Sequence, residues 1–410
     1  MSAGGAQREF FTVSTVADAL AGFRPSGRTP VEVIGLREAA GRVPAGPVLA
    51  PGALPGFARS TVDGYAVRAQ DTYGASEGLP SYFDIAGAVR MGEAPDHAVT
   101  AGTAVYIPTG GVLPSGADAV VMIEYTQEAM AGTVEVVRPV APGEGIVRAD
   151  EDVAPGQDLA RSGRPLRAQD VGLLAAAGVT RVPVLARPRV GILSTGDEVV
   201  PPETADLAIG QVRDATSVAL AALVREAGGE PVFHGIVADD RDALRRALGA
   251  ALADSDVVVI SAGSSVGARD ETATVVAELG SIWCHGLALR PGKPTMLADC
   301  GGVPLIGLPG NPRSALVVFR LVGMPIIRRA GGWTETPPVA SVTARLARNL
   351  PSAAGRLDVA QVALRDGEAE PLFGSSSLLS ILITADGYLI VPEEATGLAA
   401  GTQVDVILYS

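Results

Sequence analysis

The chain contains a single lysine, Lys293, in the segment Leu-Arg-Pro-Gly-Lys-Pro. The other 31 residues counted as lysine or arginine are all arginines. A lysine carries a compact ammonium with three donors, which the planar fork of an arginine cannot copy. We therefore interpret Lys293 as a residue whose site needs a compact ammonium. The alternative is chance retention of one lysine.

Two pairs of acidic residues each follow an apolar run of strand length. Asp197 and Glu198 follow the run GILST, and Asp239 and Asp240 follow the run HGIVA. Carboxylates are ligands that Mg²⁺ and other hard cations prefer. These two positions are therefore candidates for a cation site.

Two glycine-rich segments also follow apolar runs and lead into predicted helices. Such turns present free backbone N–H groups and the positive end of a helix dipole to an anion. Neither a GxGxxG motif after the first strand nor a GxxxxGK[ST] motif is present, which argues against a dinucleotide-binding fold and a P-loop. The residues concerned are Ser261, Gly263, Ser264, Ser265, Gly267 and Asp270 in SAGSSVGARD, and Pro309, Gly310, Asn311 and Pro312 in PGNP.

These residues need a scaffold that brings them together. Between residues 187 and 331, apolar strands alternate with segments of helical periodicity, which predicts three layers around a mainly parallel sheet. The carboxyl ends of parallel strands share one edge, so the acids and the glycine-rich turns are expected on one rim. We expect strands over 189–194, 231–240, 256–261 and 303–310, and helices over 214–230, 241–255, 270–280 and 312–330.

The rest of the chain has a different texture. Recurrent Gly and Pro between short apolar runs predict a small β-rich domain after residue 50 and a second one after residue 332. At 410 residues the chain is too long for one core, so two to four domains are expected. We expect helices over 14–23, 33–43 and 167–179, and strands over 103–110, 118–125 and 132–140.

Composition excludes several classes of protein. The net charge is −13 and only 4% of residues are aromatic, which disfavours binding to nucleic acid or to an anionic membrane. The sequence contains no apolar run of about 18 residues, so no transmembrane helix is expected. The first residues do not resemble a signal peptide. Cys284 and Cys300 lack metal-type spacing and predict free thiols in the cytoplasm.

Six motifs along the chain carry a family resemblance. Together they resemble the molybdopterin molybdenumtransferases, the MoeA family, to which the C-terminal part of gephyrin also belongs. The resemblance covers nearly the whole chain and is more specific than any one motif. In order, the motifs are STVDGYAVRAQDT, IPTGGVLPSGADAVVMIE, GILSTGDEVV, SAGSSVGARD, LRPGKPTML and GLPGNPRSALV.

The resemblance implies an α/β plus β multidomain architecture and a homodimer. Residues 1–49 and 145–186 would form an elongated N-terminal domain, and residues 50–144 an inserted β domain. A three-layer α/β/α molybdopterin-binding domain would span 187–331, and a C-terminal β domain 332–410.

It also implies a reaction in molybdenum cofactor biosynthesis. Molybdenum from molybdate would be inserted into adenylylated molybdopterin with Mg²⁺ assisting and AMP leaving, and other proteins of this biosynthesis would be partners. By motif, the catalytic residues would be Asp63, Glu198, Asp270 and Lys293, with Glu198, Asp240 (or Asp239) and Asp270 on the metal. The substrate-binding residues would be Thr109, Asp152, Ser261, Gly263, Ser265, Gly267, Arg290, Pro309, Gly310, Asn311 and Pro312.

Three departures from the family pattern keep alternatives open. Val62 stands where Met is usual, Arg290 stands where Lys is common, and SAGSSVGARDET replaces the commoner SGGVSVG. The ARDET end resembles the related molybdopterin adenylyltransferases, and a non-catalytic molybdopterin-binding scaffold is a further alternative. The retained acids Asp63, Glu198 and Asp270 favour an active enzyme, with molybdate and tungstate both open as its oxyanion.

Overall fold

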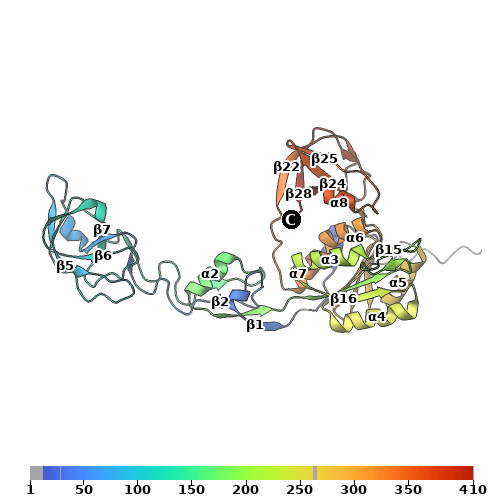
Figure 1. The fold of residues 1–410 in the computed structure, drawn as a ribbon, viewed down its shortest axis with the longest axis horizontal. Helices are drawn as coiled ribbons and strands as arrows, with labels where there is room; N and C mark the ends of the chain where they lie inside the picture. Colours follow the sequence, from blue (N-terminus) through green and yellow to red (C-terminus); the bar gives the residue numbers. More distant parts are fainter. Residues whose placement is uncertain (1–12, 28, 262–265, 410) are drawn as a thin grey trace, which may run out of the picture.

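The computed structural model describes residues 13–27, 29–261 and 266–409, with the side chains of 266–270 outside that description. The molecule is elongated (Figure 1). A β domain lies at one end, a slender segment joins it to an α/β domain at the other end, and a second β domain lies beside the α/β domain. The predicted α/β plus β multidomain architecture is confirmed.

The α/β domain is built on a six-stranded sheet in the order β16-β13-β17-β21-β20-β18. Its first four strands are parallel, whereas β20 and β18 are antiparallel to their neighbours. The predicted parallel strands are present, and the antiparallel edge was not predicted. The bounds are β13 (Arg189–Thr195), β16 (Glu230–Val237), β17 (Val257–Ser261), β18 (Ser281–His285), β20 (Met296–Cys300) and β21 (Val303–Leu308).

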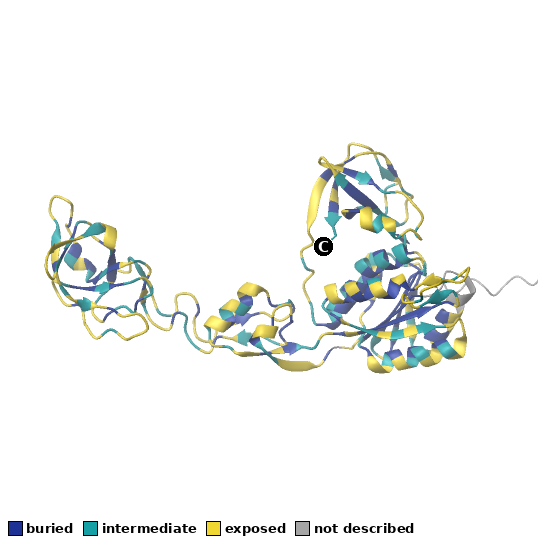
Figure 2. Ribbon diagram, in the orientation of Figure 1, coloured by how far each residue is buried: buried dark blue, intermediate teal, exposed yellow. Residues whose placement is uncertain are grey.

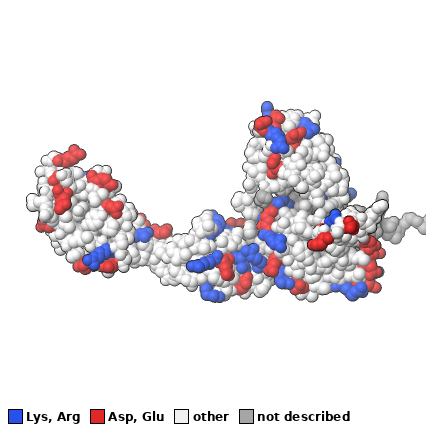
Figure 3. Space-filling view, in the orientation of Figure 1, with Lys and Arg blue, Asp and Glu red and all other residues white. Residues whose placement is uncertain are grey.

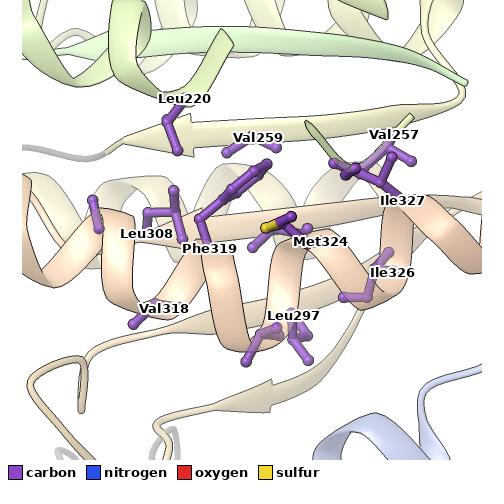
Figure 4. Packing of buried hydrophobic residues seen from close by; sticks show 14 of the residues in the cluster. Leu220, Val257, Val259, Leu297, Leu308, Val318, Phe319, Met324, Ile326 and Ile327 are labelled. Carbon is purple, nitrogen blue, oxygen red and sulfur yellow. The ribbon is translucent and has the colours of Figure 1, made fainter. Parts of the chain in front are cut away.

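Helices cover both faces of this sheet and complete the three layers (Figure 1). Phe319 is fully buried on one face, near Leu220 and Val259 (Figure 4), and Leu248 is fully buried in the core of the other face. Each such side chain stabilises the fold by about 1.5–3 kcal/mol. The helices are α3 (Ala215–Glu226), α6 (Pro312–Val318), the π-helix η4 (Phe319–Gly323) and α7 (Met324–Ala330) on the first face, and α4 (Arg241–Asp254) and α5 (Val266–Leu279) on the second.

The slender segment combines two parts of the chain. Strand β1 (Val31–Gly35) pairs antiparallel with β12 (Arg181–Leu185). The helix predicted over 33–43 is wrong. Its first three residues belong to strand β1, and only the short 3₁₀ turn η1 (Leu36–Glu38) is helical. The other elements here are β2 (Val48–Leu49), β11 (Asp158–Ala160) and α2 (Ala168–Ala176).

The first helix belongs to a different core. Helix α1 (Val16–Gly22) contributes Ala19, and the residue after it, Phe23, is buried too; both belong to the same buried cluster as Val190 of the α/β domain. The segment 1–49 therefore contributes to two parts of the molecule, the α/β core first and the slender segment from residue 31 onward.

Each β domain is built on its own six-stranded sheet, and Figure 2 shows a separate buried core in each. The inserted domain has the order β7-β4-β6-β5-β9-β8, and the C-terminal domain β19-β24-β25-β22-β28-β26. The inserted domain's strands are β4 (Gly64–Val67), β5 (Ser81–Ala88), β6 (Thr103–Ile107), β7 (Ala119–Met122), β8 (Thr126–Met130) and β9 (Thr133–Val136), with η2 (Ala69–Thr72), η3 (Ile123–Tyr125) and the outlying pair β3 (Arg59–Ser60) and β10 (Ile146–Val147). The C-terminal domain has β22 (Ser341–Leu346), β23 (Leu350–Pro351), β24 (Leu357–Arg365), β25 (Glu368–Pro371), α8 (Ser380–Thr384), β26 (Gly387–Val391), β27 (Gly397–Leu398) and β28 (Gln403–Leu408).

The strand β19 (Leu289–Arg290) joins two domains. It comes from the α/β part of the sequence but pairs in parallel with β24 of the C-terminal sheet. This pairing ties the C-terminal domain to the segment that carries the single lysine.

The surface is uneven in charge and shows no membrane-spanning feature. Figure 3 shows acidic side chains spread over the inserted β domain and arginines gathered on the slender segment next to it. Within the described residues, no helix has the length and apolar character needed to cross a membrane.

Candidate functional site

Three parallel strands of the α/β sheet end in register. Ser194 on β13 pairs with Ser261 on β17, and Ser261 pairs with Leu308 on β21. The segments that follow these strands are therefore neighbours, as the sequence predicted for a shared rim. The rim brings together the TGDE turn, the start of the SAGSSVG segment and the PGNP turn.

The TGDE turn and the end of β16 gather acids. Asp239 donates its backbone N–H to the Asp197 carboxylate at 3.1 Å. The turn before Asp197 requires Gly196, which has φ +137°, and a Cβ there would lie 2.7 Å from a Glu198 carboxylate oxygen. Burial raises the pKa of Asp239, and the negative charges of Asp197, Glu198 and Glu271 raise it further. The rim therefore has an excess of negative charge.

The two acids of the VADD segment have different roles. Asp240 is the N-cap of α4, where its side chain accepts the Ala243 N–H at 2.8 Å. Asp239 instead lies with the acids of the TGDE turn. The geometry therefore favours Asp239 over Asp240 as the candidate ligand from this segment.

The donor chemistry of the rim fits Mg²⁺ only in part. Asp197, Glu198 and Asp239 are the oxygen donors that Mg²⁺ prefers. In the part of the chain that the structure describes, no three His, Cys, Asp or Glu side chains form a group that could hold an ion. Mg²⁺ commonly uses one or two carboxylates and takes its other ligands from water and substrate phosphates, and the rim fits that arrangement.

The SAGSSVG segment is described only at its ends. Ser261 is buried and its Oγ donates to Ser194 Oγ at 3.2 Å. Gly263 and Ser265 lie outside the described residues. Gly267 and Asp270 lie in the first turns of α5, and the Asp270 side chain is also outside the description.

Asp63 and Thr109 form one cluster in the inserted β domain. The Asp63 carboxylate accepts the Thr109 backbone N–H at 2.7 Å and the Thr109 hydroxyl at 3.1 Å. Both residues are exposed. The inserted domain lies at the opposite end of the molecule from the α/β domain (Figure 1), so within one chain this cluster is far from the rim. Asp152 is exposed in the slender segment, also apart from the rim.

Lys293 lies in a large cleft between the α/β domain and the C-terminal β domain. The cleft has a volume of about 970 Å³ and is lined by Lys293 and by Arg290, both exposed. The turn between them contains Gly292 at φ +124°, where a Cβ would lie 2.3 Å from Val318 Cγ2. The turn is anchored by Leu287 N–H, which donates to the Lys293 carbonyl at 2.9 Å. The PGKP segment is therefore held against α6 and offers its ammonium to the cleft.

The PGNP turn lines the same cleft. Pro309 and Asn311 are in its wall, with Gly310 and Pro312 between and after them in the turn into α6. The Asn311 side chain donates to Ser376 Oγ of the C-terminal domain at 3.1 Å. The turn that the sequence assigned to the rim therefore also meets the second β domain.

Four further residues of the cleft were not identified from the sequence. Three lie outside the six motifs, and the fourth follows the PGNP turn, which was interpreted only for its backbone N–H groups. Arg356, Asp358 and Ser376 come from the C-terminal domain, and Arg313 follows the PGNP turn. Asp358 is buried, accepts Arg356 Nε at 3.0 Å and pairs with Arg290 at 3.4 Å. The available signal was weak: the cluster of Arg356 and Asp358 in GRLDVAQ has no periodicity that distinguishes it from a solvated face.

Comparisons with known proteins cover almost all of the chain. Residues 13–178 match the family model "MoeA N-terminal region (domain I and II)", residues 191–329 match "Probable molybdopterin binding domain", and residues 343–409 match "MoeA C-terminal region (domain IV)". Molybdopterin molybdenumtransferase 2 of Mycobacterium tuberculosis is 35% identical over 384 residues, which cover 90% of this chain and 93% of that protein.

Two further comparisons agree. A molybdopterin molybdenumtransferase of Nostoc sp. is 38% identical over 307 residues, covering 73% of this chain and 70% of that protein. A crystal structure of a molybdopterin biosynthesis MoeA protein from Pyrococcus horikoshii OT3 has a TM-score of 0.85 at 31% identity, covering 97% of this chain and 100% of that one. Sequence similarity along the full length and a shared domain arrangement thus lead to one conclusion: the chain belongs to the molybdopterin molybdenumtransferase family, as its motifs predicted.

Proposed function

We propose that this protein is a molybdopterin molybdenumtransferase, which inserts molybdenum from molybdate into adenylylated molybdopterin and releases AMP. The observation that carries the proposal is the common edge of the α/β sheet. At this edge lie carboxylates that suit a metal ion. Beside them is a cleft lined by Lys293 and Arg290, whose positive charges suit an anion. A substrate that carries phosphates, reacts with an oxyanion and uses a divalent metal needs both.

The cleft residues supply positive charge in a protein of net charge −13. Lys293 and Arg290 line the cleft from one turn and are exposed to an incoming ligand. The exposed ammonium of Lys293 can donate to any oxygen of a tetrahedral anion, and Arg290 is held toward the cleft by Asp358. We assign these two residues, with the PGNP turn, to binding of the anionic substrate.

Mg²⁺ is part of the proposal, with Glu198 and Asp239 as its first candidate ligands and Asp270 as a further one. When bound, the ion would polarise the phosphoanhydride and stabilise charge on the leaving phosphate. The residues themselves concentrate negative charge at the rim, and this charge adds to the effect of burial in raising the pKa of Asp239. Asp240 is occupied as a helix cap.

We also infer that the working molecule is a cytoplasmic homodimer. The support is the separation, within one chain, of groups that the family motifs assign to one reaction: Asp63 and Thr109 lie at one end of the molecule and the rim lies at the other (Figure 1). A second copy, placed in reverse, would bring one chain's Asp63 to the other chain's Glu198. The cleft between subunits would then close over the substrate.

One experiment tests the function. The purified full-length protein is incubated with adenylylated molybdopterin, Mg²⁺ and molybdate, and AMP and pterin-bound molybdenum are measured together. AMP release that depends on molybdate, with molybdenum recovered on the pterin, is the expected result. Formation of adenylylated molybdopterin from ATP, or binding of molybdopterin without turnover, would instead support the adenylyltransferase-like or scaffold alternative.

A further inference from the structure

The inner wall of the large cleft holds two side chains with buried donor atoms that lack a partner in the part of the chain that the structure describes. Nε and Nη1 of Arg313 are buried without a hydrogen-bond partner among the described residues, and so is Nε2 of Gln361. Both side chains line the cleft, Arg313 from α6 and Gln361 from β24 of the C-terminal domain. Gln361 is only 2% exposed. A buried donor without a partner destabilises the fold. A ligand that accepts hydrogen bonds from both Arg313 and Gln361 would remove this cost.

Among the described residues, no carboxylate forms an ion pair with Arg313. Its pKa is lowered by burial first, with the neighbouring Arg290 acting in the same direction. Asp358, an acid that lines the same cleft, is already paired with Arg290 and Arg356. The guanidinium of Arg313 is therefore a buried cation whose counter-charge is not supplied by a described residue.

Tyr409 fixes the orientation of the second donor. Its hydroxyl donates to Oε1 of Gln361, so the amide presents Nε2 as its free group. Burial raises the pKa of Tyr409 to about 12, so the phenol beside Arg313 is neutral at pH 7 and cannot serve as a counter-ion. Arg320 stacks over the Tyr409 ring at 5.1 Å and holds it in place. The donors are thus held by surrounding contacts rather than free to turn away.

We propose that Arg313 and Gln361 form an anion-binding subsite in the wall of the cleft, built for a tetrahedral oxyanion. The subsite deepens the proposed function and rests on it for the identity of the anion, which is molybdate or the phosphate of the nucleotide part of the substrate. Both present several acceptor oxygens to one guanidinium and one amide. Arg313 is then a further substrate-binding residue, next to the PGNP part of the motif GLPGNPRSALV, which is the only part to which the resemblance assigned a role.

The test measures binding of inorganic molybdate alone and of AMP alone to the full-length protein by calorimetry. Arg313→Gln should weaken binding of one or both probes about tenfold to a hundredfold, the range expected when a charged hydrogen-bond donor is lost. Loss of molybdate binding alone assigns the subsite to the metal oxyanion, and loss of AMP binding alone assigns it to the phosphate. Arg345→Gln, an exposed arginine on β22 outside the cleft, is the matched control and should bind as the wild type does.

A second variant separates binding from folding. Arg313→Leu removes an uncompensated buried cation, so its melting temperature without anions should equal or exceed that of the wild type. The rise in melting temperature that saturating molybdate or AMP gives the wild type should be smaller in this variant for at least one of the two probes. If both Arg313 variants bind molybdate and AMP with wild-type affinity, the subsite is wrong. That outcome leaves the proposed function standing, because these binding measurements do not depend on turnover.

Discussion

The single lysine acquires a defined environment in the folded chain. Lys293 is exposed, and its turn is fixed by the close packing of Gly292 against α6. Its ammonium is not engaged in an ion pair with any described residue, although the cleft contains Asp358, which binds two arginines instead. The lysine is thus available to an incoming anion, whereas Arg290 is partly neutralised.

Replacing Lys293 with Arg should leave the fold intact and reduce turnover. The side chain is exposed, so the melting temperature should stay within about 1–2 °C of the wild type, since surface changes are usually within about 0.5 kcal/mol. The planar fork cannot occupy the position of a compact ammonium, and we expect kcat for AMP release to fall at least about tenfold. Wild-type turnover in this variant would show that any cation serves at this position and that retention of the lysine was chance.

The raised pKa of Asp239 predicts how the stability of the fold depends on pH. Its pKa is raised in the folded protein, so its charged form is disfavoured there, and its contribution to stability is favourable at low pH and lost as the pH rises through the folded pKa. Asp239→Asn should therefore be more stable than the wild type at pH 7, and the difference should vanish in acid below the ordinary carboxyl pKa. Chemical denaturation at a series of pH values measures this.

Mg²⁺ supplies the matching test of the rim. The ion should stabilise the wild type at pH 7 by relieving repulsion between Asp239, Asp197 and Glu198, and should stabilise Asp239→Asn less. Asp240→Asn serves as the control on the adjacent residue, because Asp240 caps α4 and should leave the response to Mg²⁺ unchanged. An equal response of wild type and Asp239→Asn would remove Asp239 from the proposed metal site.

At the scale of single elements, helix α2 depends on one buried carboxylate. Asp170 accepts two hydrogen bonds from the Arg164 guanidinium, at 2.9 and 3.0 Å, and the backbone N–H of Arg167 at 2.8 Å. Arg167 adds two side-chain bonds at 3.0 and 3.2 Å. Hydrogen bonds from these two arginines hold the pKa of Asp170 well below its usual range. Asp170 lies in the first turn of the helix expected over 167–179, and the arginine pair is a tertiary contribution.

Asp170→Asn should destabilise the protein by about 1.5–3 kcal/mol at pH 7, because charged hydrogen bonds at a buried site are lost. The folded pKa is depressed, so this contribution is present above the ordinary carboxyl pKa and is lost as the pH falls through the folded value. The difference between variant and wild type should therefore shrink in strong acid. Urea unfolding measures it, with the exposed Glu38→Gln of the same part of the chain as a control that should stay near zero.

At the scale of the whole molecule, the elongated shape separates groups that the family motifs assign to one reaction. The inserted β domain with Asp63 and Thr109 lies at one end, and the α/β domain with Glu198 and Lys293 lies at the other (Figure 1). The C-terminal domain is joined to the α/β domain by β19, by Asn311 and by Arg290. One subunit thus contains a complete basic cleft but not a site that includes Asp63.

A mixing experiment tests whether the site crosses a dimer. Asp63→Ala and Asp270→Ala homodimers should each lose nearly all activity. In a mixed dimer, one of the two sites would carry both acids intact, because each variant supplies the acid that the other lacks. Activity should return to about half of the wild-type level per verified heterodimer, in line with the one intact site of two.

Inactive heterodimers would mean that the site is contained in one subunit. A mixture of Asp63→Ala with Thr109→Ala is the control that should not recover. These two residues share one cluster in the inserted domain, so both sites of the mixed dimer would contain one damaged Asp63–Thr109 pair.

The amino-acid sequence by itself determined the types of element in the α/β domain and their common rim. Alternating strand and helix periodicities are local, and the rule that parallel strands share their carboxyl edge converts them into a prediction of proximity. The registers of β13, β17 and β21 agree with it. Asp214, the first residue of the helix expected over 214–230, is the cap of α3, and such capping is local because it involves only the next few residues.

The tertiary structure decided what depends on contacts between distant segments. Asp239 and Asp240 are adjacent and chemically identical, and only the start of α4 assigns one to the cap and the other to the rim. The last three residues of strand β1 were predicted as helix because the pairing partner of β1, β12, lies about 150 residues later. The cleft needs Arg290 and Asp358, 68 residues apart and in different domains, and a local pattern carries no information about such a pair. The unpartnered donors of Arg313 and Gln361 likewise exist only in the fold, because burial and the absence of a partner are properties of packing, not of sequence.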